Sequence, residues 1–150
     1  MGAVGAVGCA AVVIWAGALS AVDLRERRLP NVLTLGGAAV ILAGALICGR
    51  GLSALAGAAV LGGLYLVVYL ANPAGLGGGD VKLAVALGAL TGSIGTPVWL
   101  LAALGAPVLT AVAGTAAVLR RGGAPGSSSG VPHGPSMCVA SLVAAALEVF

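Results

Sequence analysis

The sequence contains very little charge. Only 7% of its 150 residues are Asp, Glu, Lys or Arg, whereas a soluble domain carries about 25%. Hydrophobic residues make up 60% of the chain, and the mean hydropathy is +1.16. These values exclude a water-soluble domain. Because the apolar runs approach the roughly 20 residues that a helix needs to cross a bilayer, we expect an all-α integral membrane protein, with residues 1–150 forming one domain in contact with lipid.

Other absences narrow the function. The net charge of +3 is small and dispersed, which argues against a nucleic-acid partner. The three cysteines, Cys9, Cys48 and Cys138, form no C-x-x-C pair, so we expect small buried hydrophobes and neither a zinc site nor a disulfide. The single histidine, His133, is predicted to lie in a loop without a second metal ligand. It remains a candidate for the mouth of an active site, and no metal or cofactor is expected.

The positions of the apolar runs predict a compact bundle of about six transmembrane helices. Pro30 ends the first charged stretch, and Asn31 is a candidate N-cap for the second helix. Residues 91–96 are predicted to form a turn, residues 120–135 a Gly/Ser/Pro-rich loop, and Trp99 to lie at a membrane interface. The expected spans are 2–22, 32–48, 52–70, 80–90 (with a start slightly before Asp80 or an end slightly beyond Leu90 allowed), 97–119 and 136–150.

The glycines predict how these helices pack against one another, and the basic residues predict how the helices are oriented in the membrane. Lipid gives helices no hydrophobic reason to associate, so small pairs such as Gly88-x-x-x-Gly92 are expected at contacts. No Lys or Arg precedes Arg25, which favours a retained first helix over a cleaved signal peptide. If the loop after this helix is cytoplasmic, only Arg50 of the 7 Lys and Arg residues lies outside. The distribution therefore predicts that both termini lie outside.

The only two aspartates, Asp23 and Asp80, would then lie at the same cytoplasmic face of the membrane. Two neighbouring carboxylates cannot both ionise easily, so such a pair shares a proton. The ionised member can activate water while the protonated member polarises a peptide carbonyl, which is general acid–base hydrolysis. The glycines before Asp80 would let a substrate backbone approach closely.

Simpler roles remain open for the same charges. Asp80 could act only as a helix N-cap, and Asp23 could pair with Arg27 at i,i+4. Lys82 is best explained as a charge that snorkels to the headgroups and orients the helix. As a different class of function, the two aspartates could serve a small proton- or ion-coupled transporter.

Three ordered sequence elements resemble the type IV prepilin peptidases, which are membrane aspartic proteases. Gly77-Gly78-Gly79-Asp80-Val81-Lys82 matches the G-x-G-D-x-K signature of that family. Asp23 followed by Leu29-Pro30-Asn31-Val32-Leu33-Thr34 resembles its first aspartate and the Pro-Asn-x-Leu-Thr continuation. Val131-Pro132-His133-Gly134-Pro135 resembles a late Pro-aromatic-Gly-Pro element, with His133 in the aromatic position.

The resemblance implies an aspartic endopeptidase of the plasma membrane that cleaves the short basic leader of prepilin-like precursors at the cytoplasmic face. Its substrates carry a hydrophobic helix after the leader. The chain resembles the short, peptidase-only members associated with tight-adherence pili, without an amino-terminal zinc or methyltransferase domain. Asp23 and Asp80 become the catalytic pair by this resemblance. The residues that the resemblance implies as substrate-binding or motif residues are Pro30, Asn31, Gly77, Gly79, Lys82, Pro132, Gly134 and Pro135.

Overall fold

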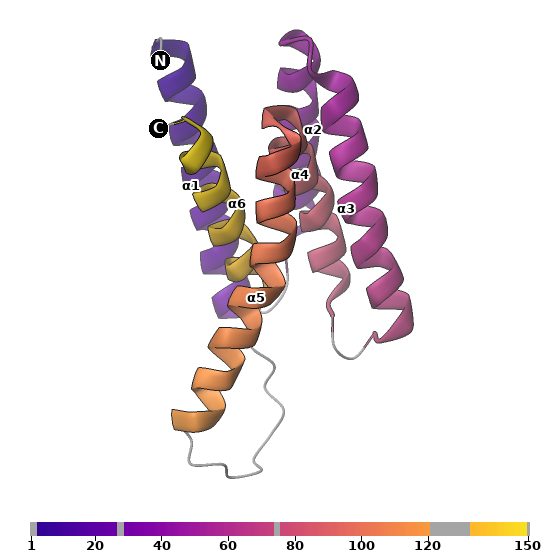
Figure 1. Cartoon of the computed structure of the whole chain (residues 1–150), viewed down its shortest axis with the longest axis vertical. Helices are drawn as coiled ribbons and strands as arrows, with labels where there is room; N and C mark the ends of the chain where they lie inside the picture. The colour runs from indigo at the N-terminus through magenta and orange to yellow at the C-terminus, as the bar shows by residue number, and fades with distance from the viewer. Residues whose placement is uncertain (1–2, 27–28, 74–75, 121–132, 150) are drawn as a thin grey trace.

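The computed structural model describes residues 3–26, 29–73, 76–120 and 133–149, and these residues form six helices and no strand (Figure 1). The prediction of an all-helical bundle of about six helices is therefore confirmed. The helices are α1 (Ala3–Glu26), α2 (Asn31–Ile47), α3 (Gly51–Ala71), α4 (Gly78–Ile94), α5 (Thr96–Arg120) and α6 (His133–Val149).

Helix α4 is the centre of the bundle, because it packs against α2, α3, α5 and α6. Helix α1 packs against α6 and, over a smaller area, α2. Leu19, Leu83 and Met137, which come from α1, α4 and α6, are among the largest fully buried side chains. The chain ends lie together at one end of the bundle, whereas the end of α1 and the starts of α4 and α6 lie toward the other (Figure 1).

Three helices are long and apolar enough to cross a membrane: Val7–Glu26, Gly51–Ala71 and Thr96–Ala117. Helices α2, α4 and α6 have 17 residues each, a length of about 26 Å at 1.5 Å per residue. This is near the lower limit for a segment that spans a hydrocarbon core of about 30 Å. The three long spans identify a multi-pass membrane protein.

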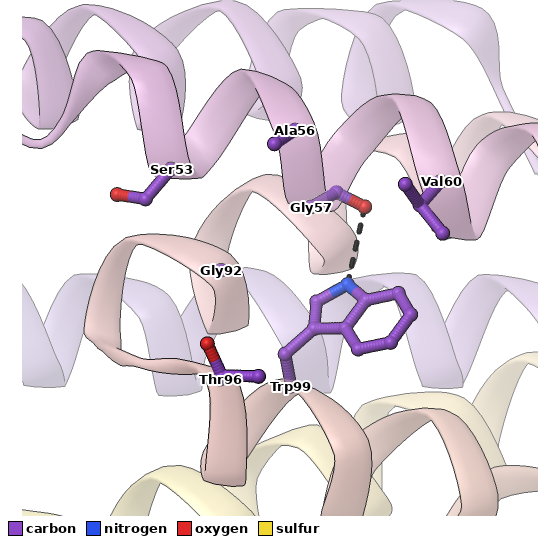
Figure 2. A pocket seen from close by; sticks show the side chains of 7 residues that line it. All are labelled: Ser53, Ala56, Gly57, Val60, Gly92, Thr96 and Trp99. Atoms are coloured by element: carbon purple, nitrogen blue, oxygen red, sulfur yellow. Dashed lines mark hydrogen bonds between the residues drawn. The ribbon is translucent and has the colours of Figure 1, made fainter.

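The contact between α3 and α4 is built from glycines, as the sequence predicts for helices in lipid. A Cβ atom on Gly92 of α4 would lie 2.8 Å from the carbonyl oxygen of Ser53 of α3, and one on Gly88 would lie 2.5 Å from the carbonyl oxygen of Gly57. The Trp99 indole donates a hydrogen bond of 3.1 Å to the same Gly57 oxygen (Figure 2). Trp99 is half-buried against α3, so its N–H serves helix packing, and its location at a membrane interface stays a prediction.

The predicted turn at residues 91–96 is wrong, because α4 continues to Ile94 and only Gly95 separates it from α5. The hydroxyls of Thr91 and Ser93 donate to the carbonyls of Leu87 and Leu90, so these polar residues satisfy their groups inside the helix. Arg50 closes the end of α4 by donating to the carbonyl oxygens of Ser93 and Ile94 at 3.0 and 3.4 Å.

The start of the last helix and two of the cysteines also differ from the expectation. Helix α6 begins at His133, three residues earlier than predicted, so His133 and Pro135 are helical. Pro tolerates this position because the first residues of a helix have no intrahelical partner for their N–H groups. Cys138 is buried as predicted, but Cys9 and Cys48 are exposed on the outside of the bundle.

Candidate active site

Asp23 lies in the last turn of α1 and is buried, with 7% of its surface exposed. The helix continues past it to Glu26, so the carboxylate sits against the bundle and not beyond the helix end. Its Oδ2 atom is fully buried and has no hydrogen-bond partner among the described residues. A buried carboxylate oxygen without a partner is costly in free energy. Residues at functional sites commonly carry such a cost.

Asp80 occupies the third position of α4 and is half-buried. Its Oδ2 accepts a hydrogen bond of 3.2 Å from the backbone N–H of Gly77, and its own N–H donates to the Gly77 carbonyl at 3.0 Å. Asp80 thus forms the carboxylate half of a capping box. Asp80 therefore does cap the start of the helix, which is the simpler role considered for it. This cap uses only one of the two carboxylate oxygens, Oδ2.

The two aspartates meet at one pocket. The pocket has a volume of about 310 Å³ and is formed where the end of α1 approaches the start of α4. Residues far apart in the sequence therefore form a single acidic site, as the predicted topology requires. The lining residues are Asp23, Leu29, Gly77, Gly78, Gly79, Asp80 and Lys82.

The glycines differ in what they do at this pocket. Only Gly77 precedes the helix, whereas Gly78 and Gly79 form its first turn. A Cβ atom on Gly79 would lie 3.0 Å from Cβ of Leu29, so a side chain there would push against the segment that leads into α2. A Cβ atom on Gly77 would meet Asp80 Oδ2 at an ordinary 3.4 Å. Gly77 therefore leaves open space beside the carboxylate, and Gly79 permits close packing.

The structure corrects the role expected for Asn31. Pro30 occupies the N-cap position of α2, and the Asn31 side chain makes no cap hydrogen bond. Instead, Asn31 Oδ1 accepts a hydrogen bond of 2.6 Å from Lys82 Nζ. Lys82 is half-buried at the pocket, so it does more than snorkel toward headgroups. This bond joins the Pro-Asn element to the G-x-G-D-x-K element.

The late motif element also reaches the site. Gly134 is buried beside Asp23, and a Cβ atom on Gly134 would lie 2.6 Å from Asp23 Oδ2. Pro135 follows it in the first turn of α6, while Pro132 lies outside the described residues. Arg27, the expected partner of Asp23, also lies outside them. The described parts of all three motif elements thus gather at one end of the bundle.

Two residues near the site were not predicted. Tyr65 of α3 and Thr110 of α5 hydrogen-bond to the two ring nitrogens of His133, at 2.9 and 2.6 Å. The sequence does show that each residue carries a hydroxyl group within an apolar span, and such a hydroxyl needs a hydrogen-bond partner. Their partner, His133, was not predictable, because the sequence does not show which face of each helix points toward the other helices.

No group of three His, Cys, Asp or Glu side chains within the described residues is arranged to hold a metal ion. The charged groups that line the pocket are the carboxylates of Asp23 and Asp80 and the ammonium group of Lys82.

Comparison with known proteins adds one finding. The sequence model of the type IV leader peptidase family matches residues 10–115. This range contains both aspartates, Pro30, Asn31, Gly77, Gly79 and Lys82, and it ends before α6. No curated protein and no solved structure matches the chain.

Proposed function

The chain belongs to the type IV leader peptidase family, and from this premise we propose that Asp23 and Asp80 are its catalytic pair. The family consists of aspartic prepilin leader peptidases, so the chain is an endopeptidase of prepilin leaders. The observation that carries the assignment of residues is that both aspartates line one pocket. The family also sets aside the transporter alternative.

The proposed mechanism is general acid–base hydrolysis without a covalent intermediate. The pair shares one proton, because two adjacent carboxylates cannot both ionise easily. The ionised carboxylate removes a proton from water as the water attacks the scissile carbonyl, and the protonated one donates a hydrogen bond to the carbonyl oxygen. The buried Oδ2 of Asp23, which has no hydrogen-bond partner among the described residues, supports this mechanism, since it can take part in such a bond. Collapse of the tetrahedral intermediate then transfers a proton to the leaving amine.

The remaining motif residues are proposed to shape the pocket for substrate. Gly77 leaves room for an extended backbone beside Asp80, and Gly79 allows Leu29 to close the wall. Lys82 and Asn31 hold the starts of α4 and α2 together through their hydrogen bond. Gly134 forms the wall beside Asp23, with Pro135 in the same turn. Pro132 is assigned to the substrate site only by its place in the motif.

We propose further that the pocket faces the cytoplasm and that both chain termini lie outside the plasma membrane. Supporting this, an even number of helices returns the chain to the side from which it started, and 6 of the 7 Lys and Arg residues then lie inside. A short basic leader would approach from the cytoplasm, and the hydrophobic helix of the substrate would enter the bilayer beside the enzyme.

The test is cleavage of a co-expressed short-leader pilin by Asp23→Asn and Asp80→Asn. Each substitution removes an ionisable carboxylate but preserves side-chain size, so we expect each to abolish the gel shift of the pilin while the enzyme remains in the membrane. Glu26→Gln is the matched control, because Glu26 is an exposed carboxylate of the same helix as Asp23. Normal cleavage by either Asn variant would disprove the catalytic pair.

A further inference from the structure

His133 links three helices at the start of α6. Its Nε2 atom lies 2.9 Å from the hydroxyl of Tyr65 on α3, and its Nδ1 atom lies 2.6 Å from Oγ1 of Thr110 on α5. Helices α5 and α6 pack against each other, but α3 and α6 are not among the helix pairs with substantial contact. The Tyr65 side chain therefore bridges two described helices that otherwise hardly touch.

The hydrogen bonds specify where the protons are. The Thr110 hydroxyl donates to the carbonyl of Ala106 at 3.0 Å. Because a hydroxyl has a single proton, Thr110 must accept from His133, which places a hydrogen on Nδ1. In a neutral imidazole the other nitrogen is then an acceptor, so the Tyr65 O–H donates to Nε2. Every polar group of this trio is satisfied in that one arrangement.

The same residue is adjacent to the part of α6 that contacts the acidic pocket. Gly134 follows His133 directly, and its backbone is so close to Asp23 that a Cβ atom would lie 2.6 Å from Oδ2. Tyr65 in turn belongs to the same buried cluster as Leu29, which lines the pocket together with Asp80. The trio thus contacts the surroundings of both carboxylates without lining the pocket itself.

We propose that His133 is a positioning residue of the peptidase. By bonding Tyr65 and Thr110 it fixes the first turn of α6, and this turn holds Gly134 against Asp23. The proposal rests on Asp23 and Asp80 being the catalytic pair. It predicts that the trio sets the geometry of that pair, so that breaking one bond lowers the rate of the chemical step more than the affinity for substrate.

The experiment measures kcat and KM for prepilin cleavage by purified enzyme, together with the melting temperature. Tyr65→Phe removes one hydroxyl and leaves the ring, which is a small change in a side chain that is 8% exposed. We expect its kcat to fall about tenfold, the effect of losing a hydrogen bond of about 1.4 kcal/mol, with KM within about twofold of wild type. Assays run well below the melting temperature separate this loss from unfolding.

A second variant tests whether the bond to His133 is responsible. In a His133→Ala background, Tyr65→Phe should cause no further loss, because both substitutions break the same bond. Thr110→Val should also lower kcat. Thr115→Val is its matched control, since Thr115 is exposed on the same helix and makes the same bond to a backbone carbonyl four residues back; it should behave as wild type.

Three outcomes would overturn the proposal: wild-type kcat in both Tyr65→Phe and His133→Ala, multiplicative losses in the double variant, or equal losses in Thr110→Val and Thr115→Val. Asp23→Asn is assayed in parallel to separate the two hypotheses. If it retains activity, the catalytic pair fails and the positioning role fails with it. If it is inactive while both Tyr65→Phe and His133→Ala cleave with wild-type kcat, only the positioning role fails.

Discussion

At the scale of single residues, Gly134 provides the sharpest test of how tightly the pocket is built. In Gly134→Ala, the new methyl group would lie 2.6 Å from the buried Oδ2 of Asp23, so the carboxylate or the start of α6 must move. We expect kcat to fall at least tenfold, since such small displacements of a catalytic group are costly. Overpacking costs about 1–3 kcal/mol and exceeds the gain of up to about 1 kcal/mol from placing Ala in a helix.

The measurement is kcat for prepilin cleavage alongside the melting temperature in detergent. Gly17→Ala is the matched control, because Gly17 lies on the same helix as Asp23 and a Cβ atom there meets nothing within 4 Å. We expect Gly17→Ala to be fully active. A Gly134→Ala enzyme with wild-type kcat would show that α6 does not constrain Asp23.

The sequence predicted the two aspartates of the pocket, but it did not predict the contacts that surround them. Asp23 and Asp80 were predictable as candidates for one site, because the predicted topology puts these scarce carboxylates at the same end of the bundle, where they can meet. The bond between Lys82 and Asn31 was not predictable: each residue has an adequate local explanation, as an orienting charge and as an N-cap. Tyr65 and Thr110 were missed for a related reason, since a mostly apolar helix gives little indication of which face is inward.

At the scale of helices, the sequence predicts some helix ends well and others poorly. The bounds of α2 and α3 differ from the predicted spans by one residue at each end, because Pro30, the Gly49-Arg50-Gly51 turn and Asn72-Pro73 mark them. The end of α4 was placed too early because Thr91, Gly92 and Ser93 are typical of turns. Their hydroxyls bond within the helix and Arg50 caps its end, and only the folded structure supplies that cap.

The contact between α3 and α4 predicts a specific loss of stability. A Cβ atom on Gly57 would approach the Gly88 carbonyl closely and would lie 2.9 Å from Cα of Gly92. Both obstacles are backbone atoms, which cannot move aside without separating the helices. Gly57→Ala should therefore destabilise the protein by about 1–3 kcal/mol, measured as a lower midpoint of unfolding in a denaturing detergent titration.

Gly63→Ala is the control for this prediction. Gly63 lies on the same helix and faces outward, and a Cβ atom added there would meet nothing within 4 Å. Because Ala favours a helix over Gly, this variant should be as stable as wild type or slightly more stable. Equal midpoints for Gly57→Ala and Gly63→Ala would contradict the tight glycine contact.

At the scale of the whole molecule, the structure gives the relative arrangement of the helices, and the basic residues predict their orientation in the membrane. Cys48 is the C-cap of α2 and is exposed. The end of α2 lies at the end of the bundle opposite to the start of α4 (Figure 1). If Asp80 faces the cytoplasm, Cys48 must face outside. A variant with Cys9→Ser and Cys138→Ser retains Cys48 as its single thiol. A membrane-impermeant maleimide should label this variant in right-side-out vesicles and leave it unlabelled in inverted ones.

Adding Ser128→Cys while replacing Cys48 by Ser moves the single thiol to the segment between α5 and α6, which is predicted to lie inside because Arg120 and Arg121 are basic. Its labelling should therefore be reversed, with reaction only in inverted vesicles. The two variants check each other, because a leaky preparation would label both thiols in both orientations. Labelling of Cys48 only in inverted vesicles would place the acidic pocket on the outer face. A leader presented from the cytoplasm would then be out of reach of Asp23 and Asp80, even if their pairing in one pocket stands.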